Sequence, residues 1–378
     1  MRYSSAVLAR YDGDFHHLKT PLIDAPAAQR DPAVIETVTS MLADIRERGL
    51  DAVLDYARTL DNYQGADIEL TAEQIASSGD RLDPDLRAAI ELGAERTQAF
   101  ARASREHLTD FETEFVPGIV TGAKYIPVSR VGAYLPAGRF PLTASAFMTV
   151  GVAKAAGVPT VIACTPPQPD GGANDAVVYA AHLSRVDRVF VIGGVQALAA
   201  MAYGLLGDLP VDMLVGAGNA FVAEAKRQLF GTVAIDLLAG PSEVAVISDE
   251  TADPVLVAAD LLGQAEHGPN SPAALITTSE EHGHAVIAEI ERQLETLATV
   301  DIAGAAWRDY GVVTVAKDRE TAAALMDDLA PEHLELLTDD DDWYHENLRN
   351  YGSIFIGPWS TVCLLYTSDA ADDLLCVD

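Results

Sequence analysis

From about residue 142 onward, short apolar segments alternate with segments of helical spacing. Each apolar segment is a continuous run, which is typical of a strand that is buried on both faces of a sheet. Strands of this kind that alternate with helices favour parallel sheets covered by helices. The expected strands are residues 160–164, 188–192, 212–215, 233–237, 244–248, 274–278, 312–315 and 353–356. The expected helices are residues 175–183, 197–203, 220–229, 255–266, 284–298 and 321–329. The sequence therefore predicts the α/β class.

The alternating region divides into two blocks, one before about residue 240 and one that starts at Val244. Residues 30–110 precede both blocks and are largely amphipathic with helical spacing. The chain length of 378 residues suggests two or three domains, and the apolar fraction of 49% is ample for their cores. We therefore expect two α/β units with a helical N-terminal portion.

The formal net charge of −32 constrains the partners of the protein. The chain has five lysines against 57 acidic residues, and such a surface repels nucleic acid and anionic membranes. It also repels itself at low salt, because screening becomes effective only as ionic strength rises. We interpret the composition as halophilic, an adaptation to a salt-rich cytoplasm. The alternative is an acidic protein of ordinary habitat.

Membrane and secretion signals are not expected from the sequence. No apolar run reaches the length of a bilayer span, and the first ten residues lack the apolar core of a secretion signal. Cys164 lies in an expected strand and is interpreted as a small core residue, whereas Cys363 and Cys376 lie near the end of the chain. We expect a cytoplasmic protein without a disulfide framework or a cysteine-based metal site.

Gln264 and His267 are three residues apart at the end of an expected helix, so their side chains share one face. Gly268 and Pro269 then end the helix, which leaves both side chains at the mouth of a loop. An amide oxygen and an imidazole nitrogen side by side could hold a metal ion. The alternative is a histidine that caps the last carbonyls of the helix.

Glu332 and His333 set a carboxylate beside a second imidazole. An imidazole titrates near neutral pH, so His333 could act as a general base, and Glu332 could take a proton from an attacking water. The alternative is an ordinary entry into a strand. A further pair, His282 and His284, points in two directions from the start of a helix and is expected to be solvated.

The segment GAGNAF, residues 216–221, follows an expected strand and opens an expected helix. Glycines at such a position let the backbone approach a phosphate at the helix N-terminus. Phe221 replaces the third glycine of the usual dinucleotide fingerprint. A tight strand-to-helix turn is therefore the simpler interpretation of this segment taken alone.

Six segments, in this order along the chain, strongly resemble the histidinol dehydrogenase family. They are RVGAYLP (130–136), GGVQA (193–197), GAGNAF (216–221), AGPSE (239–243), QAEHGP (264–269) and PEHLE (331–335). The resemblance runs from about residue 30 to residue 362 and implies an enzyme that takes the last step of histidine synthesis. Such an enzyme oxidises L-histidinol to L-histidine in two hydride transfers to NAD, with histidinaldehyde bound between them.

The resemblance also implies an architecture that periodicity could not show. Two incomplete Rossmann-like parallel-sheet domains are expected, one inserted into the other, in a homodimer. On this basis residues 1–29 are an N-terminal arm, residues 30–133 and 241–362 form the larger discontinuous domain, and residues 134–240 form the inserted domain.

Several residues match functional positions of the family. Tyr134, Gln196 and Asn219 match contacts to NAD, whose nicotinamide carries the redox step. Zn²⁺ is the second implied cofactor and helps to hold the substrate. The expected metal ligands are Gln264 and His267, the expected catalytic residues are Glu332 and His333, and the expected substrate contacts are Ser242, Gln264, His267 and His333.

The resemblance ends after residue 362. A family aspartate that binds zinc should fall at position 366, which is Tyr366 here, and residues 363–378 match nothing in the family. We interpret that stretch as a foreign or frame-shifted tail, and we expect the chain as written to bind zinc weakly and to turn over little. Two other interpretations stay open: a non-catalytic nucleotide-binding dimer scaffold, and a metallohydrolase that uses Glu332 or Glu266.

Overall fold

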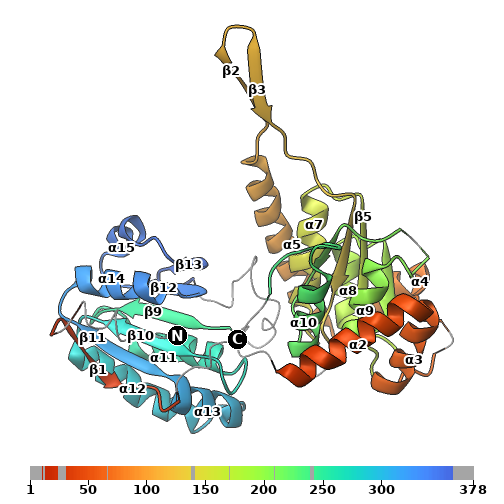
Figure 1. The fold of residues 1–378 in the computed structure, drawn as a ribbon. Coiled ribbons are helices and arrows are strands. Elements are labelled where there is room, and N and C mark those ends of the chain that lie inside the picture. The colour runs from red at the N-terminus through yellow and green to blue at the C-terminus, as the bar shows by residue number, and fades with distance from the viewer. Residues whose placement is uncertain are drawn as a thin grey trace. The chain divides into compact units, whose positions relative to one another are not determined.

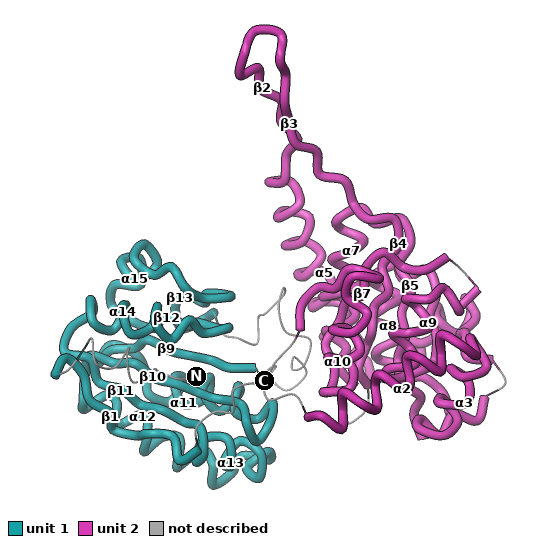
Figure 2. The backbone as a smooth tube through the Cα atoms, in the orientation of Figure 1, with its two compact units in different colours: residues 1–29, 240–365, 378 teal, residues 30–239, 366–377 magenta. Residues whose placement is uncertain are grey.

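The structure is a computed structural model that describes residues 11, 13–23, 31–65, 67–137, 141–169, 171–207, 209–238 and 242–360. The described residues form two compact units (Figure 2). Unit 1 holds residues 11–23 and 242–360, and unit 2 holds residues 31–238. Each unit contains a mainly parallel sheet, so the prediction of an α/β chain with two parallel-sheet units is confirmed. The expected non-family tail, including Tyr366, lies outside the described residues.

The sheet of unit 2 has the strand order β6-β5-β4-β7-β8 and is parallel throughout. Its strands are β4 (Arg130–Tyr134), β5 (Thr160–Thr165), β6 (Arg188–Val191), β7 (Met213–Val215) and β8 (Ala234–Ile235). Its longer helices are α2 (Pro32–Arg48), α3 (Leu50–Leu60), α5 (Pro84–Glu106), α8 (Asp175–Leu183), α9 (Gly194–Ala202) and α10 (Ala220–Leu229). Shorter helical segments are α4 (Ala72–Ala76), η2 (Ser78–Arg81), α6 (Ala144–Ala146), η3 (Phe147–Gly151) and α7 (Val152–Ala155). The predicted bounds of α8 and α10 agree with the structure.

Alternate residues of the strand β5 enter opposite cores of unit 2. In β5, Val161 and Ala163 pack with α5 and α8, whereas Ile162 and Cys164 pack with α2, α3, α9 and α10. Each side of the sheet is therefore closed by helices, which explains why the strands read as continuous apolar runs.

The domain division differs from the expected one, because residues 30–133 belong to the same unit as residues 134–239. The physical reason is burial: Val38 and Ile45 of α2 share a core with Leu198 of α9 and Leu229 of α10. In addition, β4 is the central strand of the sheet in unit 2. The segment that ends with β4 therefore cannot be separated from that sheet.

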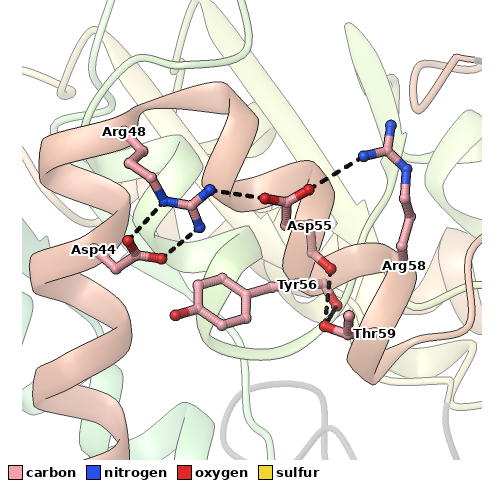
Figure 3. A network of polar contacts seen from close by, with 6 residues as sticks. All are labelled: Asp44, Arg48, Asp55, Tyr56, Arg58 and Thr59. Carbon is pink, nitrogen blue, oxygen red and sulfur yellow. Dashed lines mark hydrogen bonds and ion pairs between the residues drawn. The ribbon is translucent and has the colours of Figure 1, made fainter.

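The corner between α2 and α3 is held by ion pairs (Figure 3). Arg48 donates to Asp44 through Nε and one terminal nitrogen and to Asp55 through the other, each at 2.7 Å. Arg58 also reaches Asp55, at 3.4 Å. Each exposed pair contributes little by itself, but together they tie α3 to the helix before it.

A hairpin of β2 (Phe111–Val116) and β3 (Ile119–Ala123) extends from the end of α5 (Figure 1). Every residue of both strands is exposed. The sequence does not predict these strands, because every residue of both is exposed and no apolar pattern marks a buried side.

The sheet of unit 1 has the strand order β1-β11-β10-β9-β12-β13, in which only β1 is antiparallel to its neighbour among the described strands. The strands are β1 (Phe15–Lys19), β9 (Val244–Ser248), β10 (Ala273–Thr277), β11 (Val312–Ala316), β12 (His333–Leu337) and β13 (Ser353–Ile356). The helices are α11 (Pro254–Ala265), α12 (Glu280–Leu294), α13 (Val300–Tyr310), α14 (Arg319–Leu329) and α15 (Asp341–Asn347). No helix among the described residues is long and apolar enough to cross a membrane.

Candidate active site

Gln264 and His333 lie together at the amino-terminal edge of the sheet in unit 1. Gln264 is in the last turn of α11, His333 is the first residue of β12, and both side chains are fully buried. His333 Nδ1 is 3.1 Å from Gln264 Oε1. Because an amide oxygen only accepts, Nδ1 carries the proton of the neutral ring, and Nε2 is then free of a proton. Such a nitrogen can take a proton from a substrate.

Glu332 supplies a carboxylate at the same place. Its Oε1 lies 3.9 Å from His333 Nε2, and its side chain is 34% exposed while that of His333 is enclosed. The backbone N–H of Glu332 donates to Glu243 Oε1 at 3.3 Å, which joins the start of β12 to the start of β9. The predicted pairing of a carboxylate with an imidazole is therefore present, with a second carboxylate beside it.

The other predicted residues of unit 1 lie in adjoining turns. His267 follows α11 and is half-buried, and its backbone N–H donates to the carbonyl of Gln264 at 3.3 Å. Ser242 is half-buried and comes directly before Glu243 and β9. Glu266, proposed as the base of a hydrolase, accepts a hydrogen bond from Thr299 Oγ1 at 2.6 Å. This bond engages Glu266 away from the Gln264–His333 pair.

Gln264 has one polar atom that could donate a hydrogen bond to a bound substrate. Its Nε2 is buried and has no hydrogen-bond partner in the described structure. However, the described residues contain no group of three or more His, Cys, Asp or Glu side chains that could hold a metal ion. Within the described ranges, Gln264 and His267 therefore form at most part of a zinc site.

Asp260, which is half-buried, and Glu335, which is buried, place two carboxyl groups on the same two elements as the Gln264–His333 pair. Asp260 and Gln264 are one helical turn apart on α11, and Glu335 and His333 are on one face of β12, since Leu334 and Leu336 enter the opposite core. Burial raises the pKa of Asp260 to about 6. Burial, followed by the charge of Asp260, raises the pKa of Glu335 well above its usual value. Both carboxyl oxygens of Glu335 are buried without a hydrogen-bond partner in the described structure, which favours the neutral, protonated form of this acid.

The candidate cofactor residues of unit 2 surround the carboxyl end of β4. Tyr134 is its last residue, and its hydroxyl accepts a hydrogen bond from the N–H of Gly194 at 3.1 Å. Burial raises the pKa of Tyr134 to about 12, so the hydroxyl stays protonated and can also donate. Gln196, in the first turn of α9, is almost fully buried.

Asn219 has a clear structural role as the N-cap of α10. Its side-chain oxygen accepts from the N–H groups of Phe221 at 3.0 Å and Val222 at 3.2 Å. The tight turn predicted for residues 216–221 is therefore present. The side-chain NH₂ group of Asn219 is the part suited to a ligand.

The loop before Asn219 is fixed against β4. Gly216 has φ +114°, and a Cβ there would lie 2.3 Å from the carbonyl oxygen of Tyr134. Gly216 N–H donates to Asp236 Oδ2 at 2.7 Å, and its carbonyl accepts from the buried Lys226 Nζ at 2.8 Å. Lys226 also pairs with Asp236. Only glycine can bring the chain this close to β4.

At β4 the order in which strands are added to the sheet changes from one side to the other. From β4 the chain adds β5 and β6 on one side, and it then returns to add β7 and β8 on the other. In parallel sheets, nucleotides bind outside the carboxyl ends of the strands at such a point. The amide, phenol and backbone groups here fit a nucleotide.

Two polar features were not found from the sequence. Asp61 bonds to Gln196 and to the start of α9, and burial raises the pKa of both Asp260 and Glu335. The prediction that His282 is solvated is wrong, since it is buried and its Nε2 lies 2.9 Å from Ser248 Oγ. The available signal was spacing, namely Asp260 one turn before Gln264 and Glu335 two residues after His333.

Comparisons with known proteins identify relatives over most of the chain. The sequence profile described as histidinol dehydrogenase matches residues 25–368. A sulfopropanediol 3-dehydrogenase of Ruegeria pomeroyi is 46% identical, over 87% of this chain and 76% of that protein. A histidinol dehydrogenase of Cereibacter sphaeroides is 43% identical, over 87% of this chain and 76% of that protein. The crystal structure of histidinol dehydrogenase from Elizabethkingia anophelis superposes with a TM-score of 0.85 at 31% identity, and covers 93% of this chain and 80% of that one.

Proposed function

Because the chain belongs to the histidinol dehydrogenase family, we propose that it is a dehydrogenase that oxidises L-histidinol to L-histidine with NAD. The buried His333–Gln264 pair flanked by the carboxylates of Glu332 and Glu243 is the observation that carries the proposal. Two carboxylates and the C-terminal end of α11 favour a cationic substrate at this edge. The amine and imidazole of histidinol meet this requirement.

Each polar side chain has a definite task in this proposal. His333 Nε2 takes the hydroxyl proton of the alcohol, while Gln264 holds Nδ1 and so keeps the ring in place. Glu332, which reaches solvent, takes a proton from the water that adds to the aldehyde. NAD, when bound, accepts the hydride in each of the two oxidations. The balance is one alcohol, one water and two NAD⁺ giving one carboxylic acid, two NADH and two protons.

The residues for the cofactors are those already located. Tyr134, Gln196 and Asn219 of unit 2 would contact NAD at the carboxyl end of β4. Gln264 and His267 would be two ligands of a zinc ion. Ser242 would contact the substrate.

The test follows the absorbance of NADH after histidinol and NAD are added to the zinc-loaded protein. We expect two NADH for each histidinol consumed, with L-histidine as product. One NADH per histidinol with release of the aldehyde would contradict the four-electron reaction. NADH binding without any turnover would support the alternative of a non-catalytic scaffold, and hydrolysis without NAD would support the metallohydrolase.

A second candidate substrate is sulfopropanediol, because a relative that is 46% identical carries that name. A sulfonate is an anion and would have to approach Glu332 and Glu243, which disfavours it at this edge. Both substrates are therefore offered to the same preparation. A higher kcat/KM for sulfopropanediol than for histidinol would replace the first proposal by the second.

We further propose a homodimer in which a second copy covers the β2–β3 hairpin. The hairpin exposes Phe115 at 73% and Val120 at 60%, and an isolated two-stranded hairpin is marginally stable in water. Light scattering after gel filtration should give twice the chain mass. The change Phe115→Glu should shift the protein toward monomer, whereas Leu209→Glu, at an exposed apolar residue outside the hairpin, should not.

Salt dependence provides a test of the halophilic interpretation. The net charge of −32 should make the folded protein more stable as salt rises toward the molar range, because salt screens the repulsion between carboxylates. Thermal unfolding in a potassium chloride series measures this effect. A midpoint that is highest near physiological ionic strength would contradict the interpretation.

A further inference from the structure

Asp61 links the helical N-terminal portion to the candidate cofactor residues within unit 2. It is the residue that caps α3, and its Oδ2 accepts two hydrogen bonds, both of 2.9 Å. One comes from the backbone N–H of Gly193, and the other comes from Nε2 of Gln196. The carboxylate at the end of α3 therefore accepts from the N-cap amide of α9 and from the side chain of Gln196 in the first turn of α9.

The local backbone is built to admit this carboxylate. A Cβ on Gly193 would lie 3.1 Å from Asp61 Oδ1 and 3.0 Å from Pro166 Cβ, so glycine leaves room for the contact. Gly194 has φ +57°, and its N–H is directed to the hydroxyl of Tyr134. The amide of Gly193 therefore donates to Asp61, and the amide of Gly194 donates to Tyr134.

The position of Asp61 is fixed by packing and by ion pairs. Val53 and Ala57 of α3 are fully buried in the core that α9 also enters. Arg48 bridges α2 to Asp55 of α3 (Figure 3). Asp61 lies at the end of α3, so the packing of this helix keeps its carboxyl group beside Gly193 and Gln196.

A carboxylate has consequences for the amide group that it binds. An ionised Asp accepts and cannot donate, so Gln196 must turn its NH₂ group toward Asp61. The carbonyl oxygen, Oε1, then remains as the group that Gln196 can offer to a ligand. Because Gln196 is only 1% exposed, water cannot take the place of Asp61 as the partner that selects this orientation.

We propose that Asp61 is a positioning residue that orients the amide of Gln196, so that Oε1 accepts a hydrogen bond from a hydroxyl or amide donor of NAD. The inference rests on the proposed function, in which Gln196 contacts NAD. Asp61 itself does not touch the cofactor in this arrangement. It also occupies the amide of Gly193, which is therefore closed to a cofactor phosphate.

The test is a double-mutant cycle on positions 61 and 196. Asp61→Ala removes the acceptor of both hydrogen bonds, so nothing orients the amide of Gln196, whereas Asp61→Asn keeps one oxygen, which can accept both bonds because both donors share Oδ2. Gln196→Ala removes the amide, and the double variant with Asp61→Ala completes the cycle. The readout is NADH affinity, measured by fluorescence on the purified chain, with thermal unfolding of each variant as the check on folding.

We expect Asp61→Ala to weaken NADH binding about tenfold, the effect of losing one buried hydrogen bond, and Asp61→Asn to keep the affinity within about twofold of the parent. The double variant should bind NADH no more weakly than Gln196→Ala alone, because Asp61 acts through Gln196. Asp51→Asn, a change at an exposed acid of α3, should leave NADH affinity unchanged. A purely structural role of Asp61 would instead make the two losses add.

Three outcomes would overturn the inference. If the parent chain binds NADH and Asp61→Ala binds it equally well, the orientation of Gln196 does not depend on Asp61. A double variant that binds NADH about tenfold more weakly than Gln196→Ala, with unfolding unchanged, would mean that Asp61 acts independently of Gln196. No NADH binding by the parent chain would contradict the proposed cofactor site, and the inference would fall with it.

Discussion

Units 1 and 2 have the same kind of sheet but use opposite edges of it. In unit 2 the candidate residues follow the carboxyl ends of the strands, around Tyr134 and Asn219. In unit 1 they lie at the amino ends, around His333 at the start of β12 and Glu243 just before β9. In both sheets the first central strand, β4 or β9, has a later strand added on each side. Topology alone therefore does not decide which edge is used.

The difference between the edges is electrostatic. The carboxyl edge of unit 2 gathers the N-termini of α9 and α10, and the dipoles of these helices place partial positive charge where an anionic cofactor would bind. The amino edge of unit 1 has the C-terminal turn of α11 beside Glu332 and Glu243, which suits a cation or an amine. The same kind of sheet thus provides one site that suits an anion and one site that suits a cation.

The largest expected effect is at the amino edge of unit 1. The change His333→Ala removes the only side chain in the buried pair that can take a proton, so kcat should fall by about 10²- to 10⁴-fold. NADH affinity should stay unchanged, because the cofactor residues belong to unit 2. His345→Ala, at an exposed histidine of α15, is the matched control. A loss of NADH binding in His333→Ala would contradict the assignment of the cofactor to unit 2 and of proton transfer to unit 1.

The second effect is at the carboxyl edge of unit 2. The change Gly216→Ala places a Cβ 2.3 Å from the carbonyl oxygen of Tyr134 at φ +114°, so the free energy of unfolding should fall by about 2–4 kcal/mol. The comparison is Gly231→Ala, which also has a positive φ but no atom within 4 Å of its Cβ. Chemical denaturation measures both. Equal losses would show that backbone strain, and not the approach to β4, is the cause.

The two units also differ in how far they could be predicted. The continuous apolar strands gave the α/β class and most strand positions, because burial on both faces imposes a simple pattern. The membership of residues 30–133 was not predictable, since the apolar face of α2 specifies burial but not the surface that buries it. The Glu332–His333 pair could be found because its members are adjacent in sequence. Asp61 could not, because 135 positions separate it from Gln196.

The carboxyl groups of Asp260 and Glu335 in unit 1 should produce a pH dependence that unit 2 does not share. Because the folded state raises the pKa of Asp260 to about 6 and also that of Glu335, it keeps protons that the unfolded chain releases. The free energy of unfolding should therefore fall as pH rises from about 4 through 6 and beyond, by about 3 kcal/mol for Asp260 alone. Glu335→Gln removes one acid and should flatten this dependence.

Urea denaturation at several pH values measures the effect of Glu335→Gln. The control is Glu346→Gln, which changes an exposed acid of α15 and should leave the pH dependence as it is. If the parent protein and Glu335→Gln lose stability equally over this range, Glu335 does not keep its proton in the folded state.

The smallest expected effect separates the two roles of Asn219. Asn219→Ala removes the oxygen that caps α10, which should lower the free energy of unfolding by about 1 kcal/mol. Asn219→Asp keeps that oxygen and places a negative charge at the helix N-terminus, so stability should be retained or slightly raised. The same change removes the NH₂ group and sets a carboxylate where the phosphates of NAD are attracted, so NADH affinity should fall. Weaker NADH binding in Asn219→Asp with undiminished stability would assign Asn219 to the cofactor as well as to the helix, whereas unchanged NADH binding would leave it as a cap alone.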